Sequence, residues 1–316
     1  MIKLTPQKKI ISSHYNDVRP ELVKRINKVL SKGCIKKGKR KNITVDVTPW
    51  MRMFLEYLLV EENLKKLITG EHSELKSIIG AIIAEAPALL DKDEPDFKIL
   101  SNIFLSHGYG KLNKDEFVFN IGVDTCPYCN RNYTLSAKKR VKPEIDHFFP
   151  SSIYPLLAVS FFNLIPACSP CNGIHAKHNK DSYLLKMISP YEVDADDYRF
   201  SYTVKSISII NPIAGKSKID VILRGSSRMA SNTSVFHLEA LYAMHEDHVL
   251  ELIIKKRLKY SEKYQKHLSS YRGLSLTRNE IDRMILGNIP EEKRQHERPL
   301  SKLYQDIGVE LGLIRR

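Results

Sequence analysis

Hydrophobic residues recur at helical spacing in the first 120 residues and again beyond residue 235. One face of a helix repeats every three to four residues, so this spacing predicts amphipathic helices rather than strands. Thr48 is a suitable N-cap, and Pro49 after it suits a first helical turn. The expected helices are 20–30, 48–68, 72–91, 96–106, a stretch from 235 onward, 277–287 and 299–313.

The middle of the chain shows a different pattern. Short apolar pieces around 141–149 and 161–166 predict one strand and a second strand that returns beside it. Residues 198–224 alternate and are rich in β-branched residues, which predicts two strands joined through Asn211-Pro212 and Gly215. We therefore expect an α+β protein with a mainly helical region 1–120, a module 121–185, and a region 186–316 of two strands followed by helices.

The net charge of +14 makes nucleic-acid binding a candidate function. A strongly positive field attracts polyanions, and nucleic acid is the commonest of these. Residues 32–41 hold the densest basic run and contain two glycines, so we expect a loop or mobile arm that either lies along phosphates or is simply solvated. The sequence has no apolar run of about 18 residues and no signal-peptide pattern, so we expect a cytoplasmic protein without membrane association.

Four of the five cysteines form two C-x-x-C pairs, Cys126 with Cys129 and Cys168 with Cys171. In a reducing compartment this spacing indicates metal binding rather than disulfides. Four thiolates complete a tetrahedral Zn²⁺ site and leave no open position, so the predicted zinc is structural. Cys34 is left over and is expected to be a plain free thiol.

Asp146 and His147 follow the first short apolar segment of this module. Neighbouring side chains on a strand point to opposite sides, so one can bind a metal while the other faces a water. A neutral histidine can take a proton from that water near pH 7. Asn172, directly after Cys171, offers a carbonyl oxygen to a hard cation, so we expect Asp146 and Asn172 to share one Mg²⁺ or Mn²⁺ ion.

Several basic residues follow Asn172, on a helix that we expect to begin at Cys171 and Asn172. His175, Lys177 and Lys180 are candidate phosphate contacts, although basic residues early on a helix are also common as solvated surface. His245, Glu246, Asp247 and His248 could imitate a metal site further along the chain. A solvated helix face is the better interpretation of that group, because the module already supplies a complete set of ligands.

Together these residues resemble the HNH endonuclease family, which has a ββα-metal fold. The resemblance follows the pattern C-x₂-C, D-H-x₂-P, N-L and C-x₂-C-N over about 55 residues. It implies that Asp146 is a metal ligand, His147 the general base, and Asn163 a residue that braces the loop between the strands. It also implies that Asn172 is a second ligand where other members have His, and that the cysteines are zinc knuckles. His175 stands where many members have Lys.

The resemblance implies a metal-dependent endonuclease that hydrolyses phosphodiester bonds in DNA. The segment 241–261 is similar to C-terminal helices of bacterial HNH proteins paired with an ATPase, such as the nuclease subunit of Septu-type anti-phage defence. Two alternatives stay open. The cysteines and the charge would also fit a zinc-ribbon protein that binds nucleic acid without catalysis, and the substrate of a nuclease could be RNA, such as tRNA.

Overall fold

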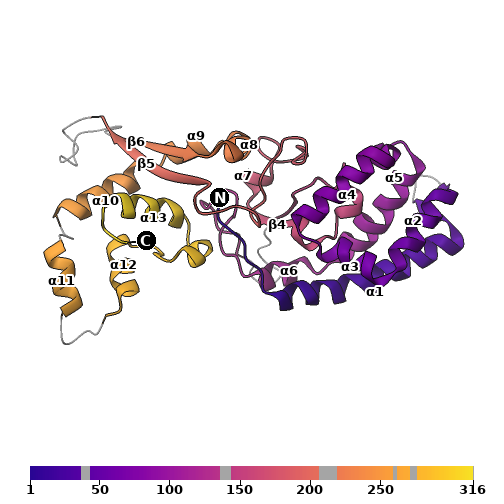
Figure 1. Cartoon of the computed structure of the whole chain (residues 1–316), viewed down its shortest axis with the longest axis horizontal. Coiled ribbons are helices and arrows are strands. Elements are labelled where there is room, and N and C mark those ends of the chain that lie inside the picture. Colours follow the sequence, from indigo (N-terminus) through magenta and orange to yellow (C-terminus); the bar gives the residue numbers. More distant parts are fainter. Residues whose placement is uncertain (37–42, 136–143, 206–218, 259–261, 271–275, 316) are drawn as a thin grey trace.

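The computed structural model describes residues 1–36, 43–135, 144–205, 219–258, 262–270 and 276–315. It combines many helices with three antiparallel two-stranded sheets, so the α+β prediction is confirmed. The chain is elongated, with the N-terminal helices at one end and the last helices at the other (Figure 1). The cysteine module and the N-terminus lie between the two ends. In the described part of the chain, no helix has both the length and the apolar character needed to cross a bilayer.

The N-terminal end is built from helices, as expected, but their bounds differ from the prediction. The first helix runs through Lys8–Lys32, whereas we expected an extended start and a helix near 20–30. Its buried residues recur every three to four positions from His14 to Val29, and this stripe continues across Pro20. The helices are α1 (Lys8–Lys32), α2 (Pro49–Leu59), α3 (Glu61–Thr69), α4 (His72–Glu85), α5 (Pro95–Leu100) and α6 (Lys114–Ile121).

Three predicted helices of the N-terminal region, 48–68, 72–91 and 96–106, are each divided in the structure. The stretch 48–68 breaks at Val60, whose backbone is extended, so α2 and α3 are separate helices. The Thr48 hydroxyl accepts the amide hydrogen of Met51 at 3.0 Å, which confirms the predicted cap. The stretch 72–91 leaves the α conformation at Ala86, because a residue before proline disfavours it, and a short 3₁₀ turn follows at Pro87–Leu90. A π-helix, Ser101–Gly108, and a 3₁₀ turn, Tyr109–Lys111, connect α5 to α6.

Half of the predicted basic arm, 32–41, lies outside the described residues, which omit 37–42. On either side of this gap, β1 (Cys34–Lys36) pairs with β2 (Ile43–Val45), so part of the expected loop is strand. The C-terminal half contains the two predicted strands, β5 (Tyr198–Val204) and β6 (Ile219–Gly225), but their connection at 206–218 also lies outside the described part. The later helices are α8 (Ala230–Val235), α9 (Leu238–Ala243), α10 (Glu246–Leu258), α11 (Glu262–Ser270), α12 (Arg278–Leu286) and α13 (Ser301–Glu310).

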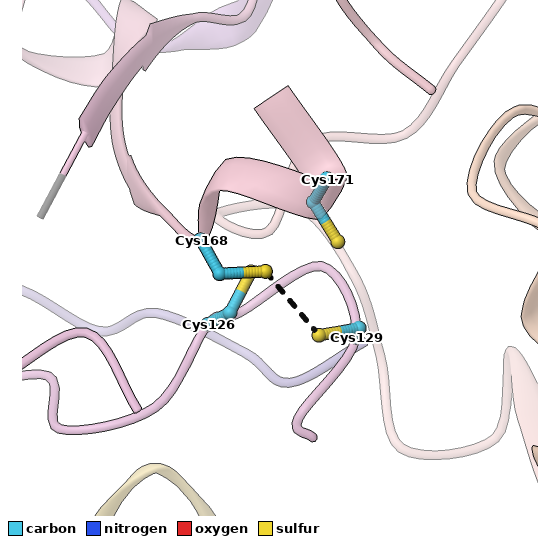
Figure 2. A group of neighbouring side chains, drawn as sticks. All are labelled: Cys126, Cys129, Cys168 and Cys171. Carbon is cyan, nitrogen blue, oxygen red and sulfur yellow. Dashed lines mark hydrogen bonds between the residues drawn. The ribbon is translucent and has the colours of Figure 1, made fainter. Parts of the chain in front are cut away.

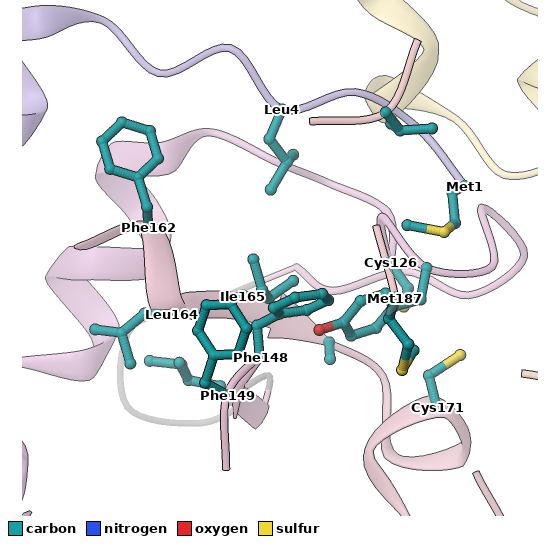
Figure 3. Close-up of a cluster of buried hydrophobic side chains, with 14 of the residues drawn as sticks. Met1, Leu4, Cys126, Phe148, Phe149, Phe162, Leu164, Ile165, Cys171 and Met187 are labelled. Atoms are coloured by element: carbon teal, nitrogen blue, oxygen red, sulfur yellow. The ribbon is translucent and has the colours of Figure 1, made fainter. Parts of the chain in front are cut away.

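The module between these halves has a small hairpin at its centre. Strand β3 (Glu144–His147) pairs antiparallel with β4 (Leu164–Ala167), close to the two predicted strands. The phenylalanines beside these strands, Phe148, Phe149 and Phe162, are buried in one apolar cluster that also contains Met1 and Cys171 (Figure 3). The hairpin therefore packs into the same apolar core that contains the four paired cysteines.

The long helix expected from Cys171 and Asn172 onward is absent. The structure has only α7 (Ser169–Asn172), a four-residue helix that begins after Cys168 and ends at Asn172. Gly173 follows in an extended conformation, and a Cβ there would lie 2.9 Å from the Ser169 carbonyl oxygen. The chain beyond it forms turns, and this change redirects Lys177 into the interior.

Candidate active site and metal centre

The four paired cysteines meet in one place. Cys126 and Cys129 come from a loop, while Cys168 and Cys171 come from the end of the hairpin and from α7, and their sulfurs converge (Figure 2). All four sulfur atoms lie within 4.8 Å of one another, and Cys129 Sγ is 3.9 Å from Cys168 Sγ. Four sulfurs bound to one zinc at about 2.3 Å would lie about 3.8 Å apart, so this group can hold a zinc ion. Cys34 is a buried free thiol in β1, outside this group.

The chemistry of the four thiols also suits a cation. All four side chains are buried, which would make four separate thiolates costly. Hydrogen bonds among the thiols nevertheless lower the pKa of Cys168 and of Cys129, while the pKa values of Cys126 and Cys171 are raised, so two of the four sulfurs favour the ionised form. The amides of Arg131 and Asn132 point at sulfurs, with Arg131 N 3.4 Å from Cys129 Sγ and Asn132 Nδ2 3.4 Å from Cys168 Sγ. Such contacts from neighbouring N–H groups orient the ligands of a metal site.

Strand β3 places Asp146 and His147 next to the cysteine group. Asp146 is 3% exposed, and its Oδ2 accepts a 2.6 Å hydrogen bond from the hydroxyl of Tyr128. Its Oδ1 lies 3.8 Å from the ammonium nitrogen of Lys177, which is beyond hydrogen-bonding distance. Burial raises the pKa of Asp146, whereas the nearby Lys177 charge lowers it. The Tyr128 hydroxyl thus fixes the position of the carboxylate, and the buried Lys177 ammonium compensates its negative charge.

His147 is held with one nitrogen engaged. Its Nε2 lies 3.0 Å from the carbonyl oxygen of Ala158, and a carbonyl can only accept, so Nε2 carries the proton. The basic nitrogen is therefore Nδ1. Burial lowers the pKa of His147 to about 4, so the ring is neutral at pH 7. The ring of Tyr109 packs against it edge-on, with centroids 4.4 Å apart, and fixes its plane.

Asn163 is a wholly buried link in the loop between the strands. Its Oδ1 accepts the amide hydrogen of Phe149 at 2.7 Å, and its Nδ2 donates to the carbonyls of Phe149 at 3.1 Å and Leu157 at 2.9 Å. These three bonds satisfy backbone groups that would otherwise be buried without partners. These bonds fix the segment that follows His147 against the segment that contains Leu157, which fits the expected bracing of the loop between the strands.

The side-chain amide nitrogen of Asn172 is engaged by a neighbouring carboxylate, whereas we expected the amide oxygen to serve as an ion ligand. Its Nδ2 donates a 2.7 Å hydrogen bond to Oε2 of Glu144, and Ser169 Oγ donates to the other oxygen of the same carboxylate. Glu144 and Asp146 are alternate residues of β3, so they share a face of the strand. Glu144 is a second carboxylate on the Asp146 face that our sequence interpretation did not consider, although strict alternation along the strand could have indicated it.

The residues proposed as phosphate contacts divide into two groups. His175 and Lys180 are exposed, and the Lys180 ammonium donates to the carbonyl of Ala176. Lys177 is 0% exposed, so its ammonium is not available to a substrate phosphate in this structure. It donates instead to the carbonyl oxygen of His147 at 3.2 Å and forms the ion pair with Asp146. We expected Lys177 on a helix, either as a phosphate contact or as solvated surface, but the helix ends at Asn172 and the Lys177 side chain is buried.

Asp146 fits a Mg²⁺ or Mn²⁺ ion on chemical grounds. Magnesium in nucleic-acid enzymes is typically held by one or two carboxylates, while water and substrate phosphates complete its shell. Asp146 has one oxygen without a hydrogen-bond donor, and Glu144 lies on the same face. Asp146, assisted by Glu144 or Asn172, would hold the ion, and the ion would supply a positive centre for a scissile phosphate.

A second histidine group lies at the start of α10. Ligand atoms of His245, Asp247 and His248 lie within 4.8 Å of one another. However, Arg131 Nε donates to His245 Nε2 at 2.8 Å, and Tyr304 pairs with His248 at 2.7 Å. The two histidines are therefore hydrogen-bonded and partly buried rather than simply solvated, and one ring nitrogen of His245 already accepts from a guanidinium.

Comparison with known proteins gives one clear likeness. No protein-family model matches the chain. No solved structure matches it either. Over 129 residues, however, the chain is 30% identical to the Septu protein PtuB of Bacillus thuringiensis. That match spans 39% of this chain and 46% of the relative, so just under half of the relative's length is covered. The chain is thus similar, over that part, to a Septu protein.

Proposed function

We propose that this chain is a metal-dependent endonuclease of the HNH type that hydrolyses phosphodiester bonds in DNA. The observation that carries the proposal is the geometry of His147. Its Nε2–H group donates to the Ala158 carbonyl. The ring is neutral at pH 7, so Nδ1 carries a lone pair that can accept a proton. A general base must be deprotonated and fixed in orientation, and this side chain is both.

The chain's own residues divide the work. Nδ1 of His147 takes a proton from the attacking water, while Tyr109 and the Ala158 carbonyl keep the ring from rotating. Asp146 would hold the divalent ion, and the chemistry that such an ion would supply is stabilisation of the negative charge on the departing 3′ oxygen. Asn163 fixes the loop that follows His147. The Cys₄ group would hold a structural zinc, which would join the loop of Cys126 to the hairpin.

The biological setting in this proposal is bacterial anti-phage defence, with an ATPase subunit as partner. The similarity to a Septu protein supports it. A second support is an apolar strip on α2, where Trp50, Met53 and Tyr57 are 40%, 62% and 55% exposed. Exposed aromatic residues of this kind are enriched at protein–protein interfaces. The mass of the native particle, purified from its own host, tests this part: a monomer that is fully active alone would refute it.

The nuclease proposal is tested by incubating the purified protein with plasmid, linear duplex DNA, single-stranded DNA and tRNA. Each substrate is combined with Mg²⁺, Mn²⁺ or EDTA. Cleavage of DNA that needs a divalent ion and stops in EDTA supports the proposal. Cleavage of tRNA alone moves the substrate to RNA. Binding of DNA without any cleavage, under all three conditions, leaves the chain as a non-catalytic zinc protein.

A further inference from the structure

The two cysteine loops do more than close a metal site, because each one also reaches the carboxylate of Asp146. In the first loop, Tyr128 lies between Cys126 and Cys129, and its hydroxyl donates to Asp146 Oδ2 at 2.6 Å. Tyr128 is wholly buried, so its hydroxyl cannot donate to bulk water and needs the carboxylate as its hydrogen-bond acceptor.

The second loop reaches the other oxygen of the same carboxylate. The backbone amide of Lys177 donates to the carbonyl of Cys171 at 3.0 Å, which fixes where its side chain begins. From there the ammonium lies 3.8 Å from Asp146 Oδ1 and 3.2 Å from the carbonyl oxygen of His147. Asp146 is therefore held between the two loops that a zinc ion would join.

We propose that Tyr128 is a positioning residue that sets the Asp146 carboxylate for the divalent ion, and that zinc in the Cys₄ group makes this possible. The inference rests on the proposed function, because it takes Asp146 to be the ion's ligand. With zinc bound, both loops would be fixed and Tyr128 would hold Oδ2. Oδ1, which lies beyond hydrogen-bonding distance of Lys177, would then be the oxygen for the ion. Without zinc, the donor on Oδ2 would be free to move.

The hydroxyl of Tyr128 is not needed to hold the ring in place. The ring stacks on Phe236 with centroids 4.3 Å apart, so a phenylalanine at this position would keep the packing. Phenylalanine would remove only the hydrogen bond to Asp146. Residues that hydrogen-bond to a metal ligand typically change metal affinity by about 10- to 100-fold when they are mutated.

The same region contains a matched control. Tyr242 is also buried, packs on Phe200, and donates its hydroxyl to the carbonyl oxygen of Cys129 at 2.6 Å. It therefore contacts the same cysteine loop as Tyr128 but makes no hydrogen bond to Asp146. Replacing Tyr242 by phenylalanine measures the cost of losing a buried hydroxyl beside the zinc group, without touching the ion's ligand.

The experiment measures Mn²⁺ binding to the full chain by electron paramagnetic resonance, together with zinc content by mass spectrometry. We expect Tyr128→Phe to retain its zinc and bind Mn²⁺ about 10-fold more weakly or worse. Tyr242→Phe should bind Mn²⁺ as the wild type does. Removing zinc from the wild type should abolish Mn²⁺ binding.

The outcomes separate the inference from the proposed function. If the wild type binds Mn²⁺ and cleaves DNA, but Tyr128→Phe binds Mn²⁺ equally well, the inference is overturned and the function stands. Equal weakening in both tyrosine variants also overturns it, because the effect then belongs to the zinc loop in general. A wild type that binds no Mn²⁺ removes the ion site, and the inference with it.

Discussion

Protonation of one buried histidine should make the stability of this protein depend steeply on pH. His72 begins α4, is 2% exposed, and neither ring nitrogen has a hydrogen-bond partner. Its ring packs against Phe148 and Phe149, the two residues that follow His147 in the candidate site. Burial lowers the pKa of His72 to about 3, against an ordinary value of 6.5.

The lowered pKa sets the direction of the effect. Below pH 6.5 an unfolded chain takes up a proton at this position, while folded His72 stays neutral until about pH 3. The unfolded state therefore binds more protons in this window, and the free energy of unfolding falls as the pH falls. Between pH 7 and pH 5 the loss from this one group is about 2 kcal/mol.

The test is urea unfolding of the wild type and of His72→Leu at pH 7 and pH 5, with His237→Asn as control because His237 is exposed. We expect the stability difference between His72→Leu and the wild type to shift by about 2 kcal/mol in favour of the variant at the lower pH. The control should follow the wild type. Parallel pH dependence in the wild type and His72→Leu would refute the reasoning.

Three further predictions concern the candidate site. Lys177→Met should lower the free energy of unfolding by about 3–5 kcal/mol, measured in EDTA, because it leaves the buried Asp146 charge unpaired. Mn²⁺ should recover part of that loss, and an unchanged stability would contradict the ion pair. Asn163→Ala should cost on the order of 3 kcal/mol, since three buried backbone groups lose their partner, and thermal unfolding would show it. Cys171→Ser should remove the zinc and lower the melting temperature, and full zinc retention would argue against a Cys₄ site.

Local sequence patterns predicted the parts of the fold that depend on local chemistry. The cap at Thr48, the hairpin of β3 and β4, and the gathering of the four cysteines follow from side-chain type and spacing, and all appear in the structure. The α+β class follows from the same two periodicities. Each of these features depends on residues that are close in sequence, or on cysteines that can bind the same metal ion.

Patterns failed where tertiary contacts decide the conformation. The sequence after Cys171 is basic and resembles the start of a helix, but Gly173 ends α7 and Lys177 finds Asp146 in the interior. A lysine becomes buried only when such a partner is available, and the partner is distant in sequence. The same holds for Asn172, which pairs with Glu144, and for Tyr128, whose acceptor is 18 residues away.

Cleavage by a His147→Ala variant tests the central claim most directly. The assay follows nicking of a supercoiled plasmid with Mg²⁺ or Mn²⁺, beside a measurement of the zinc bound per chain. We expect the wild type to nick the plasmid, while the variant keeps its zinc and loses nicking by about 100-fold or more, because the water then has no base. A variant that cuts as fast as the wild type would contradict the assignment of His147.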